Sequence, residues 1–99
     1  MTVEAPTDIE VRNNDLRSRY ELFVDGAFLG FAEYRDTGDV LVFPHTVIDA
    51  EHRGNGLGAH LVRGALDDVR RRGRAVVARC WYVAEFIDEN PQYKDLVAA

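Results

Sequence analysis

The sequence predicts a mixed α/β domain (α+β). An antiparallel β-meander comes first, and a strand, a glycine loop, a helix, a strand and a helix follow it. Two observations support this prediction. Strand-like alternation with tight-turn signals fills the first half of the 99-residue chain, and helical spacing of apolar residues begins only after Asp49. Between the two regions, three glycines alternate in the run from Arg53 to Gly58.

The first half is expected to form strands joined by tight turns. Asp25-Gly26 is typical of a two-residue hairpin turn, and the run from Asp36 to Asp39 supplies the next turn. The expected strands begin near Ile9 and cover residues 19–24, 27–34 and 40–48. Successive strands connected in this way make an antiparallel meander. Residues 1–7 show no periodicity and are expected to be flexible.

The second half alternates helices with one strand. Apolar residues recur at helical spacing from Leu57, and Gly73 is positioned to cap the end of that helix. The expected elements are a helix over 57–72, a buried strand over 75–80, a helix over 81–88 and a short turn from 90 to 97. The strands at 40–48 and 75–80 should lie side by side and parallel, because a helix connects them by a right-handed crossover. The result is a mixed sheet.

Composition limits the class of protein. Ninety-nine residues with 46% hydrophobic content are enough for one domain, expected to span residues 1–99. The net charge of −5 argues against nucleic-acid binding, and no apolar run approaches the ~20 residues of a membrane span. The single cysteine, Cys80, cannot form an intramolecular disulfide, which favours a reducing cytoplasm. The spacing of His52 and His60 does not resemble a metal site, so no metal is predicted.

The glycine loop indicates a ligand with a phosphate or diphosphate group. Alternating glycines let the backbone turn its N–H groups into one concavity, and the next helix adds free amides and the positive end of its dipole. Residues 54–59 also fit the dinucleotide pattern G-x-G-x-x-A. That alternative requires an acidic residue at the end of the next strand, where this chain has Arg79-Cys80. The Gly-Lys-Ser/Thr of a P-loop is absent.

Several motifs together identify a resemblance to a known family. Arg-x-x-Gly-x-Gly, from Arg53 to Gly58, follows an extended strand and opens a helix. His45-Thr46 stands on the preceding strand, Cys80 ends the next one, and a Val-Ala and an Asn-Pro-Gln-Tyr motif follow it. This pattern, over residues 18–97, resembles the minimal single-domain branch of the GNAT superfamily of acyl-CoA-dependent N-acetyltransferases.

The resemblance implies how acetyl-CoA binds. Main-chain N–H groups of the loop would hold the diphosphate of coenzyme A; these residues are Arg53, Gly54, Asn55, Gly56, Leu57 and Gly58. The strand around Val47 would pair with the pantetheine arm through backbone hydrogen bonds. In this fold the two parallel strands splay apart and leave a slot for the thioester beside Cys80.

In this branch of the family, His45 and Cys80 are the candidate catalytic residues. Histidine accepts protons near neutral pH, so His45 could act as a base. Alternatively, His45 shares a strand face with Phe43 and Val47 and makes one hydrogen bond. Cys80 could form an acyl-enzyme, protonate the leaving thiolate, or simply be a buried small residue. We favour direct transfer, with Cys80 in or near the slot.

One departure from the family bears on catalysis. Many GNAT enzymes carry a tyrosine acid in the helix after Cys80, where this chain has Phe86 and Ile87. Tyr82 and Tyr93 are not assumed to replace it, and Trp81, Tyr82 and Phe86 are interpreted as packing residues. We therefore expect an N-acetyltransferase acting on a small amine or a protein lysine, as a monomer or weak dimer. The alternative is a CoA-binding module without turnover.

Overall fold

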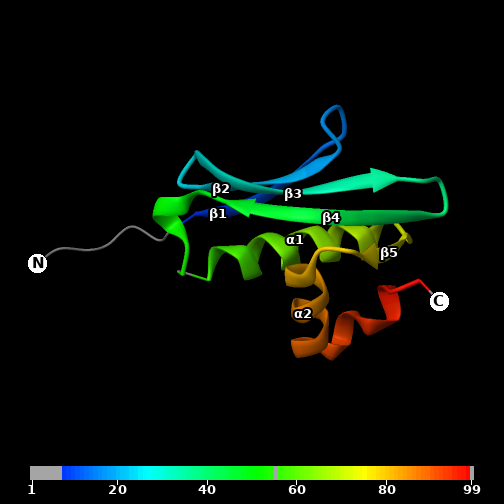
Figure 1. Ribbon diagram of the computed structural model, residues 1–99. Coiled ribbons are helices and arrows are strands. Elements are labelled where there is room, and N and C mark those ends of the chain that lie inside the picture. The colour runs from blue at the N-terminus through cyan, green and yellow to red at the C-terminus, as the bar shows by residue number, and fades with distance from the viewer. Residues whose placement is uncertain (1–7, 55, 99) are drawn as a thin grey trace, which may run out of the picture.

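The computed structural model describes residues 8–54 and 56–98 of the chain. The expectations for residues 1–7 and for Asn55 lie outside the described residues. The elements, in chain order, are β1 (Ile9–Asn14), β2 (Arg19–Val24), β3 (Ala27–Asp36), β4 (Val40–Ile48), η1 (Ala50–His52), α1 (Leu57–Arg71), β5 (Ala75–Ala78), α2 (Trp81–Glu89) and η2 (Pro91–Leu96). Figure 1 shows these elements as one sheet above the helices.

The predicted meander is confirmed. Strands β1 to β4 pair antiparallel with their sequence neighbours, and the strand order in the sheet is β1-β2-β3-β4-β5. Asp25 and Gly26 both have positive φ, at 50° and 85°, which matches a type I′ hairpin turn between β2 and β3. Strand β3 runs two residues further than expected, to Asp36.

The predicted parallel pair is also confirmed. Strand β5 pairs parallel with β4 over four residues, from Val40↔Ala75 to Phe43↔Ala78, and α1 is the crossover between them. Gly73 has a φ of 67° and its N–H bonds to Arg70, as expected for the residue after a helix end. The sheet is therefore mixed, with four antiparallel strands and one parallel strand among the described residues.

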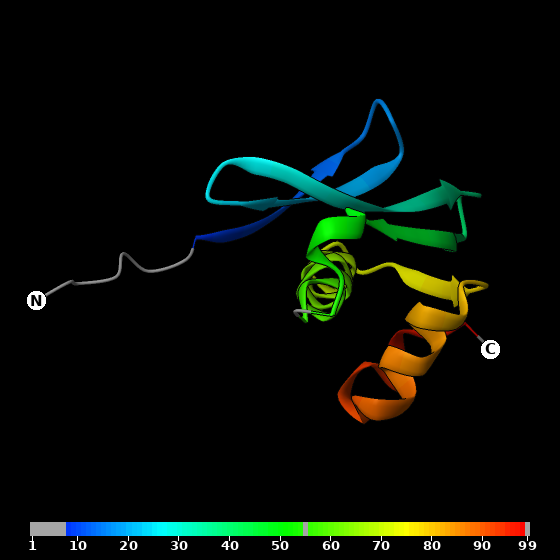
Figure 2. The same cartoon turned by 60° about the vertical axis from the view of Figure 1, so that its left-hand side comes forward.

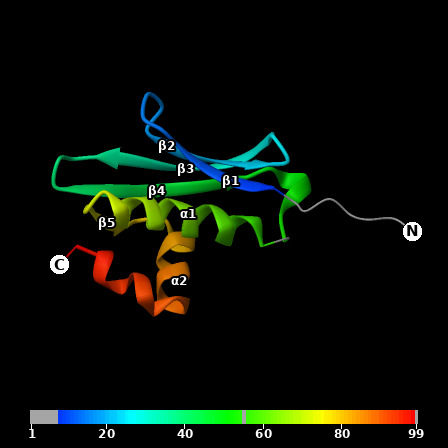
Figure 3. The ribbon, with the colours of Figure 1, turned by 180° about the vertical axis from the view of Figure 1, so that it is seen from behind.

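The core lies between one face of the sheet and the helices. Figures 2 and 3, which view the molecule from other sides, show α1 and α2 on the same side of the sheet. Tyr20, Leu22 and Phe43 from the strands are buried against Leu61 and Leu66 from α1. Each of these side chains contributes the apolar burial that stabilises a domain of this size.

Strand β5 ends earlier than predicted. Its last residue is Ala78 instead of Cys80, because the main-chain N–H groups of Arg79 and Cys80 both donate to the carbonyl oxygen of Phe43, at 3.1 and 2.9 Å. The chain then turns into α2 at Trp81. Strand β4 continues to Ile48 without a parallel partner, so the two strands diverge beyond Phe43.

A β-bulge changes the face on which the residues of β4 lie. The register with β3 shifts between Glu33 and Arg35, so that Phe43 and Pro44 together oppose one residue of β3. Proline is tolerated in a strand at such a position. Because the bulge inserts one residue into the alternation, Phe43 is buried in the core, whereas His45 is exposed. The alternative interpretation of His45 places it on one face with Phe43, and this placement is wrong.

Candidate functional site

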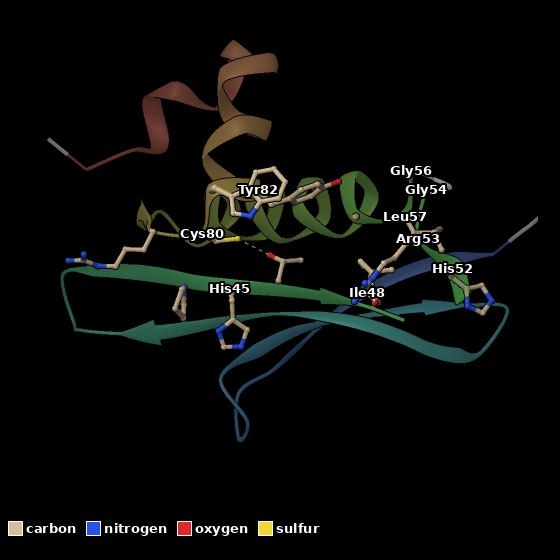
Figure 4. A pocket seen from close by; sticks show the side chains of 14 residues that line it. His45, Ile48, His52, Arg53, Gly54, Gly56, Leu57, Cys80 and Tyr82 are labelled. Atoms are coloured by element: carbon tan, nitrogen blue, oxygen red, sulfur yellow. Dashed lines mark hydrogen bonds between the residues drawn. The ribbon is translucent and has the colours of Figure 1, made fainter. Parts of the chain in front are cut away.

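One pocket joins the glycine loop to the place where β4 and β5 diverge. Its volume is about 620 Å³. It is lined by Pro44, His45, Thr46, Ile48, His52, Arg53, Gly54, Gly56, Leu57, Gly58, Arg79, Cys80, Trp81 and Tyr82. Figure 4 shows the loop residues at one end of this pocket and Cys80 toward the other. A long ligand could therefore contact both ends at once.

Two glycines of the loop adopt backbone conformations that favour glycine. Gly54 and Gly56 have φ values of 84° and 76°, which L side chains rarely adopt. Gly56 is the N-cap of α1 and provides no side-chain cap, so the first amides of the helix stay available. The partial positive charge of the helix end acts in the same direction. Arg53 is tied back to β4 by a 3.2 Å hydrogen bond from its Nε to the carbonyl of Ile48.

The free part of β4 presents a main-chain edge to the pocket. The N–H of Asp49 donates to the carbonyl of Leu29, so the opposed pairs 29–49, 31–47 and 33–45 are the hydrogen-bonded ones. The main-chain groups of His45 and Val47 therefore point toward β3. The main-chain groups of Thr46 and Ile48 point to the opposite edge of β4. Strand β5 pairs along this edge only as far as Phe43, so the edge is free beside Thr46 and Ile48.

Cys80 and Thr46 meet where the strands diverge. Cys80 is the N-cap of α2 and is only 7% exposed. Its thiol donates to Thr46 Oγ1 at 3.8 Å (Figure 4). Because both side chains line the pocket, a thioester held here would have a thiol and a hydroxyl beside it.

His45 lies at the same end of the pocket but points the other way. Its Nε2 is 3.5 Å from Glu33 Oε1, and its ring packs edge-on against Phe31. Figure 4 shows the imidazole on the side of β4 away from Cys80. The structure thus places the two predicted catalytic side chains at one pocket but on opposite faces of the sheet.

The face that carries His45 is aromatic. Phe23, Phe28 and Phe31 form a row with ring centroids 5.7 and 6.4 Å apart, which the ring of His45 extends across β3 and β4. The Arg19 guanidinium lies 4.5 Å from the centroid of Phe31, within cation–π range. Phe28 is nevertheless 45% exposed, so this face offers apolar surface beside the pocket.

Two aromatic residues of α2 also belong to the site. Trp81 and Tyr82 pack edge-to-face, with ring centroids 5.7 Å apart, and both line the pocket. The prediction that Trp81 is a packing residue is wrong, because its side chain is 72% exposed. Phe86 is buried, as that interpretation predicted.

Asp49 stabilises the approach to the loop through two short contacts. Asp49 Oδ1 accepts the N–H of Glu51 at 2.9 Å and lies 3.2 Å from His52 Nδ1. The pKa of Asp49 is lowered, first by the bond from the Glu51 amide and then by His52. Asp49 therefore stays ionised at neutral pH and caps η1, directly before Arg53.

Sequence reasoning missed the parts of the site that depend on register. Thr46 and Ile48 supply the free edge, whereas the prediction centred on Val47, and Tyr82 lines the pocket although it was assigned to packing. Only cross-strand register and helix orientation distinguish these residues.

Within residues 8–54 and 56–98 there is no cluster of three or more potential metal ligands. In the same ranges no helix is long and apolar enough to cross a membrane.

Comparison with known proteins gives the same fold and a family. Residues 19–96 match the model of a family described as GCN5-related N-acetyl-transferase. Protein NATD1 of Gallus gallus is 28% identical over 91 residues, which cover 90% of this chain and 83% of that protein. Protein NATD1 of Bos taurus is 38% identical over 47 residues, covering 48% of this chain and 42% of the bovine protein.

A solved structure has a similar fold. The ribosomal-protein-alanine N-acetyltransferase from Brucella melitensis biovar Abortus 2308 superposes with a TM-score of 0.52 at 22% sequence identity. The match covers 82% of this chain and 61% of that one. At this identity the likeness concerns the fold alone.

Proposed function

Because the chain belongs to the GCN5-related N-acetyltransferase family, we propose that it binds acetyl-CoA and transfers the acetyl group to an amine. The acceptor in this proposal is a small amine or a lysine of another protein. The observation that carries the proposal is one continuous pocket, with glycine-loop amides at one end and Cys80 at the other. In acetyl-CoA the pantetheine arm separates the diphosphate from the thioester, which matches this arrangement.

Coenzyme A binding would use the main chain almost entirely. The loop amides from Arg53 to Gly58, with the N-terminus of α1, hold the diphosphate. The free edge of β4 pairs with the amides of the pantetheine arm. The register supports Thr46 and Ile48 as the main-chain partners in this pairing, because Val47 lies between them and bonds to β3. Such pairing extends the sheet by a strand-like ligand.

The reaction would take place beside Cys80 and Thr46. The amine nitrogen attacks the thioester carbonyl, the C–N bond forms and the C–S bond breaks. The nitrogen loses one proton, and the departing thiolate gains one. In direct transfer, the Cys80 thiol would give its proton to the thiolate and recover one from solvent. His45, whose imidazole points away from Cys80, would receive the proton of the amine through an intervening water molecule.

A second candidate is a CoA-binding module without turnover. One observation favours it: Phe86 and Ile87 occupy the helix segment where many relatives carry a tyrosine acid, and both are buried. Neither side chain can donate a proton to a leaving thiolate. In this alternative the pocket binds CoA with the same contacts, but no acceptor reacts.

Two measurements separate the candidates. Calorimetric titration tests CoA binding, and release of free thiol from acetyl-CoA, with and without a panel of amines and lysine peptides, tests turnover. The transferase proposal expects amine-dependent thiol release, with a loss of about 10²-fold or more in Cys80→Ala. CoA binding without turnover on any acceptor supports the module. No binding of CoA at millimolar concentration contradicts both.

A further inference from the structure

Tyr82 lies directly on the first turn of α1. A Cβ built on Gly58 would stand 2.5 Å from the Tyr82 hydroxyl oxygen, 2.9 Å from Cζ and 3.1 Å from Cε2. Gly58 thus leaves the space that the phenol occupies. Figure 4 shows Tyr82 above the pocket, between Cys80 and the glycine loop.

Space, rather than backbone conformation, explains the third glycine of the loop. Gly54 and Gly56 have left-handed φ values, whereas Gly58 lies within α1 and has no positive φ. Alanine would suit that helical conformation better than glycine does. The feature that requires glycine at position 58 is the ring of Tyr82, so the two residues form one structural unit.

The hydroxyl of Tyr82 lies beside the first turn of α1, the end of the helix that has free amides. Its oxygen is 2.5 Å from the Cβ position of Gly58, the second residue of that helix. Within the described residues, the hydroxyl has no hydrogen-bond partner, whereas Tyr20 and Tyr93 bond to Asp68 and Asp67. A phenol this close to a set of free amides can share their ligand.

We propose that Tyr82 is a diphosphate-binding residue, whose hydroxyl donates to the same group that the amides of the glycine loop hold. This assignment rests on the proposed function, since it takes coenzyme A as the ligand. It adds a contact from α2 to a site otherwise formed by the loop and α1. The diphosphate would thereby fix α2, and with it Cys80 at the N-cap of the same helix, relative to the loop.

The protonation state of Tyr82 suits a donor. Burial raises the pKa of its phenol, and the charges of Glu85 and Glu89 raise it further. The group is therefore neutral at physiological pH and carries a proton to donate. A neutral hydroxyl does not repel a diphosphate, and a hydrogen bond to a charged acceptor is stronger than one between neutral groups.

Tyr82→Phe tests the contact with two probes. Coenzyme A contains both the diphosphate and pantetheine, whereas adenosine 3′-phosphate 5′-diphosphate contains the diphosphate without pantetheine. Tyr82→Phe should weaken the binding of both by about tenfold or more, as expected for a hydrogen bond to a charged group. Tyr93→Phe, which loses a hydroxyl bonded to Asp67 outside the pocket, is the matched control and should bind both probes normally.

The outcomes separate this inference from the proposed function. Unchanged binding of both probes by Tyr82→Phe overturns the inference, and so does weakening of coenzyme A alone, which would place the hydroxyl on the pantetheine arm. If the unmodified protein binds neither probe, the proposed function fails, and the inference fails with it.

A double-mutant cycle tests the unit of Gly58 and Tyr82. Gly58→Ala displaces the phenol and should weaken coenzyme A binding severalfold in the natural chain. In a Tyr82→Ala background, the added methyl meets no ring and should have no further effect, so the two changes are non-additive. Urea denaturation checks that each variant is folded. If Gly58→Ala weakens coenzyme A binding equally in both backgrounds, Gly58 and Tyr82 do not form one structural unit.

Discussion

The two halves of β4 differ in what they do, although they belong to one strand. Residues 40–43 pair with β3 and β5, and their inward side chains, Leu41 and Phe43, are 2% and 1% exposed. Residues 45–48 pair with β3 alone and face the pocket along their free edge. The first half stabilises the fold, and the second half presents a free main-chain edge to the pocket.

Two local features cause this difference. The bulge at Phe43 and Pro44 turns His45 away from the core, and the early end of β5 frees the edge beside Thr46. Because both features occur at the same point, the free edge begins where the core contribution of the strand ends. Substitutions on either side of Pro44 should therefore have separable effects on stability and on ligand binding.

The largest expected effect is on the stability of the paired half. Phe43→Ala removes a buried ring that packs against Tyr20 and Tyr34, at centroid distances of 6.2 and 6.0 Å. It should lower the free energy of unfolding by about 3–5 kcal/mol in urea titrations. Val47→Ala is the control in the free half and should change it by less than about 0.5 kcal/mol, because Val47 is 39% exposed. Equal losses of unfolding free energy in the two variants would contradict the division of β4 into two halves with different roles.

The next effect separates binding from backbone strain. Gly56→Ala and Gly38→Ala each force a side chain into the left-handed region, at φ values of 76° and 94°, without a steric clash. Both should lower the free energy of unfolding by about 1–2 kcal/mol. Only Gly56→Ala should also weaken coenzyme A binding, by about tenfold or more, since Gly38 lies in a distant turn. Calorimetry on both variants measures this difference.

The sequence was sufficient to predict the meander, the crossover helix and the parallel pair, because each depends on local periodicity or turn chemistry. Asp25-Gly26 specifies its own turn, and Gly73 its own helix end. Both act within a few residues of the chain. The glycine loop was recognised for the same reason, and Gly54 and Gly56 have the backbone conformation for which glycine is needed.

The parts that sequence analysis could not predict depend on contacts between distant segments. The bulge is a property of the pairing of β3 with β4, so strict alternation placed His45 on the wrong face. The end of β5 depends on the two bonds to the carbonyl of Phe43. The position of Tyr82 depends on where α2 meets α1. Such contacts have no signature within either segment alone.

A smaller effect should appear with pH in the paired half. The Tyr20 hydroxyl, buried behind Phe43, donates to Asp68 Oδ2 at 2.7 Å, and burial followed by this bond raises the pKa of Tyr20. The folded protein thus holds a proton that the unfolded chain releases near pH 10. Stability from this group is complete below pH 10 and decreases as pH rises through the folded pKa.

Tyr20→Phe isolates this contribution. It should lower the free energy of unfolding by about 1–2 kcal/mol at pH 7, because it removes one hydrogen bond to a charged group. It should also make the alkaline decrease shallower, although Tyr34, Tyr82 and Tyr93 retain raised pKa values and part of the slope. Urea titrations between pH 7 and 11 measure both quantities. An unchanged slope above pH 10 would contradict the role of Tyr20.

The smallest effect on stability is expected in the free half. Thr46→Val keeps the shape of the side chain but removes the oxygen that accepts the Cys80 thiol at 3.8 Å. A thiol is a weak donor, so the free energy of unfolding should change by less than about 1 kcal/mol. Coenzyme A binding should persist, because the main-chain edge of β4 is retained. Thiol release from acetyl-CoA should fall in Thr46→Val and be kept in Thr46→Ser, which restores the hydroxyl. Equal turnover in both variants would mean that the free half acts through its backbone alone.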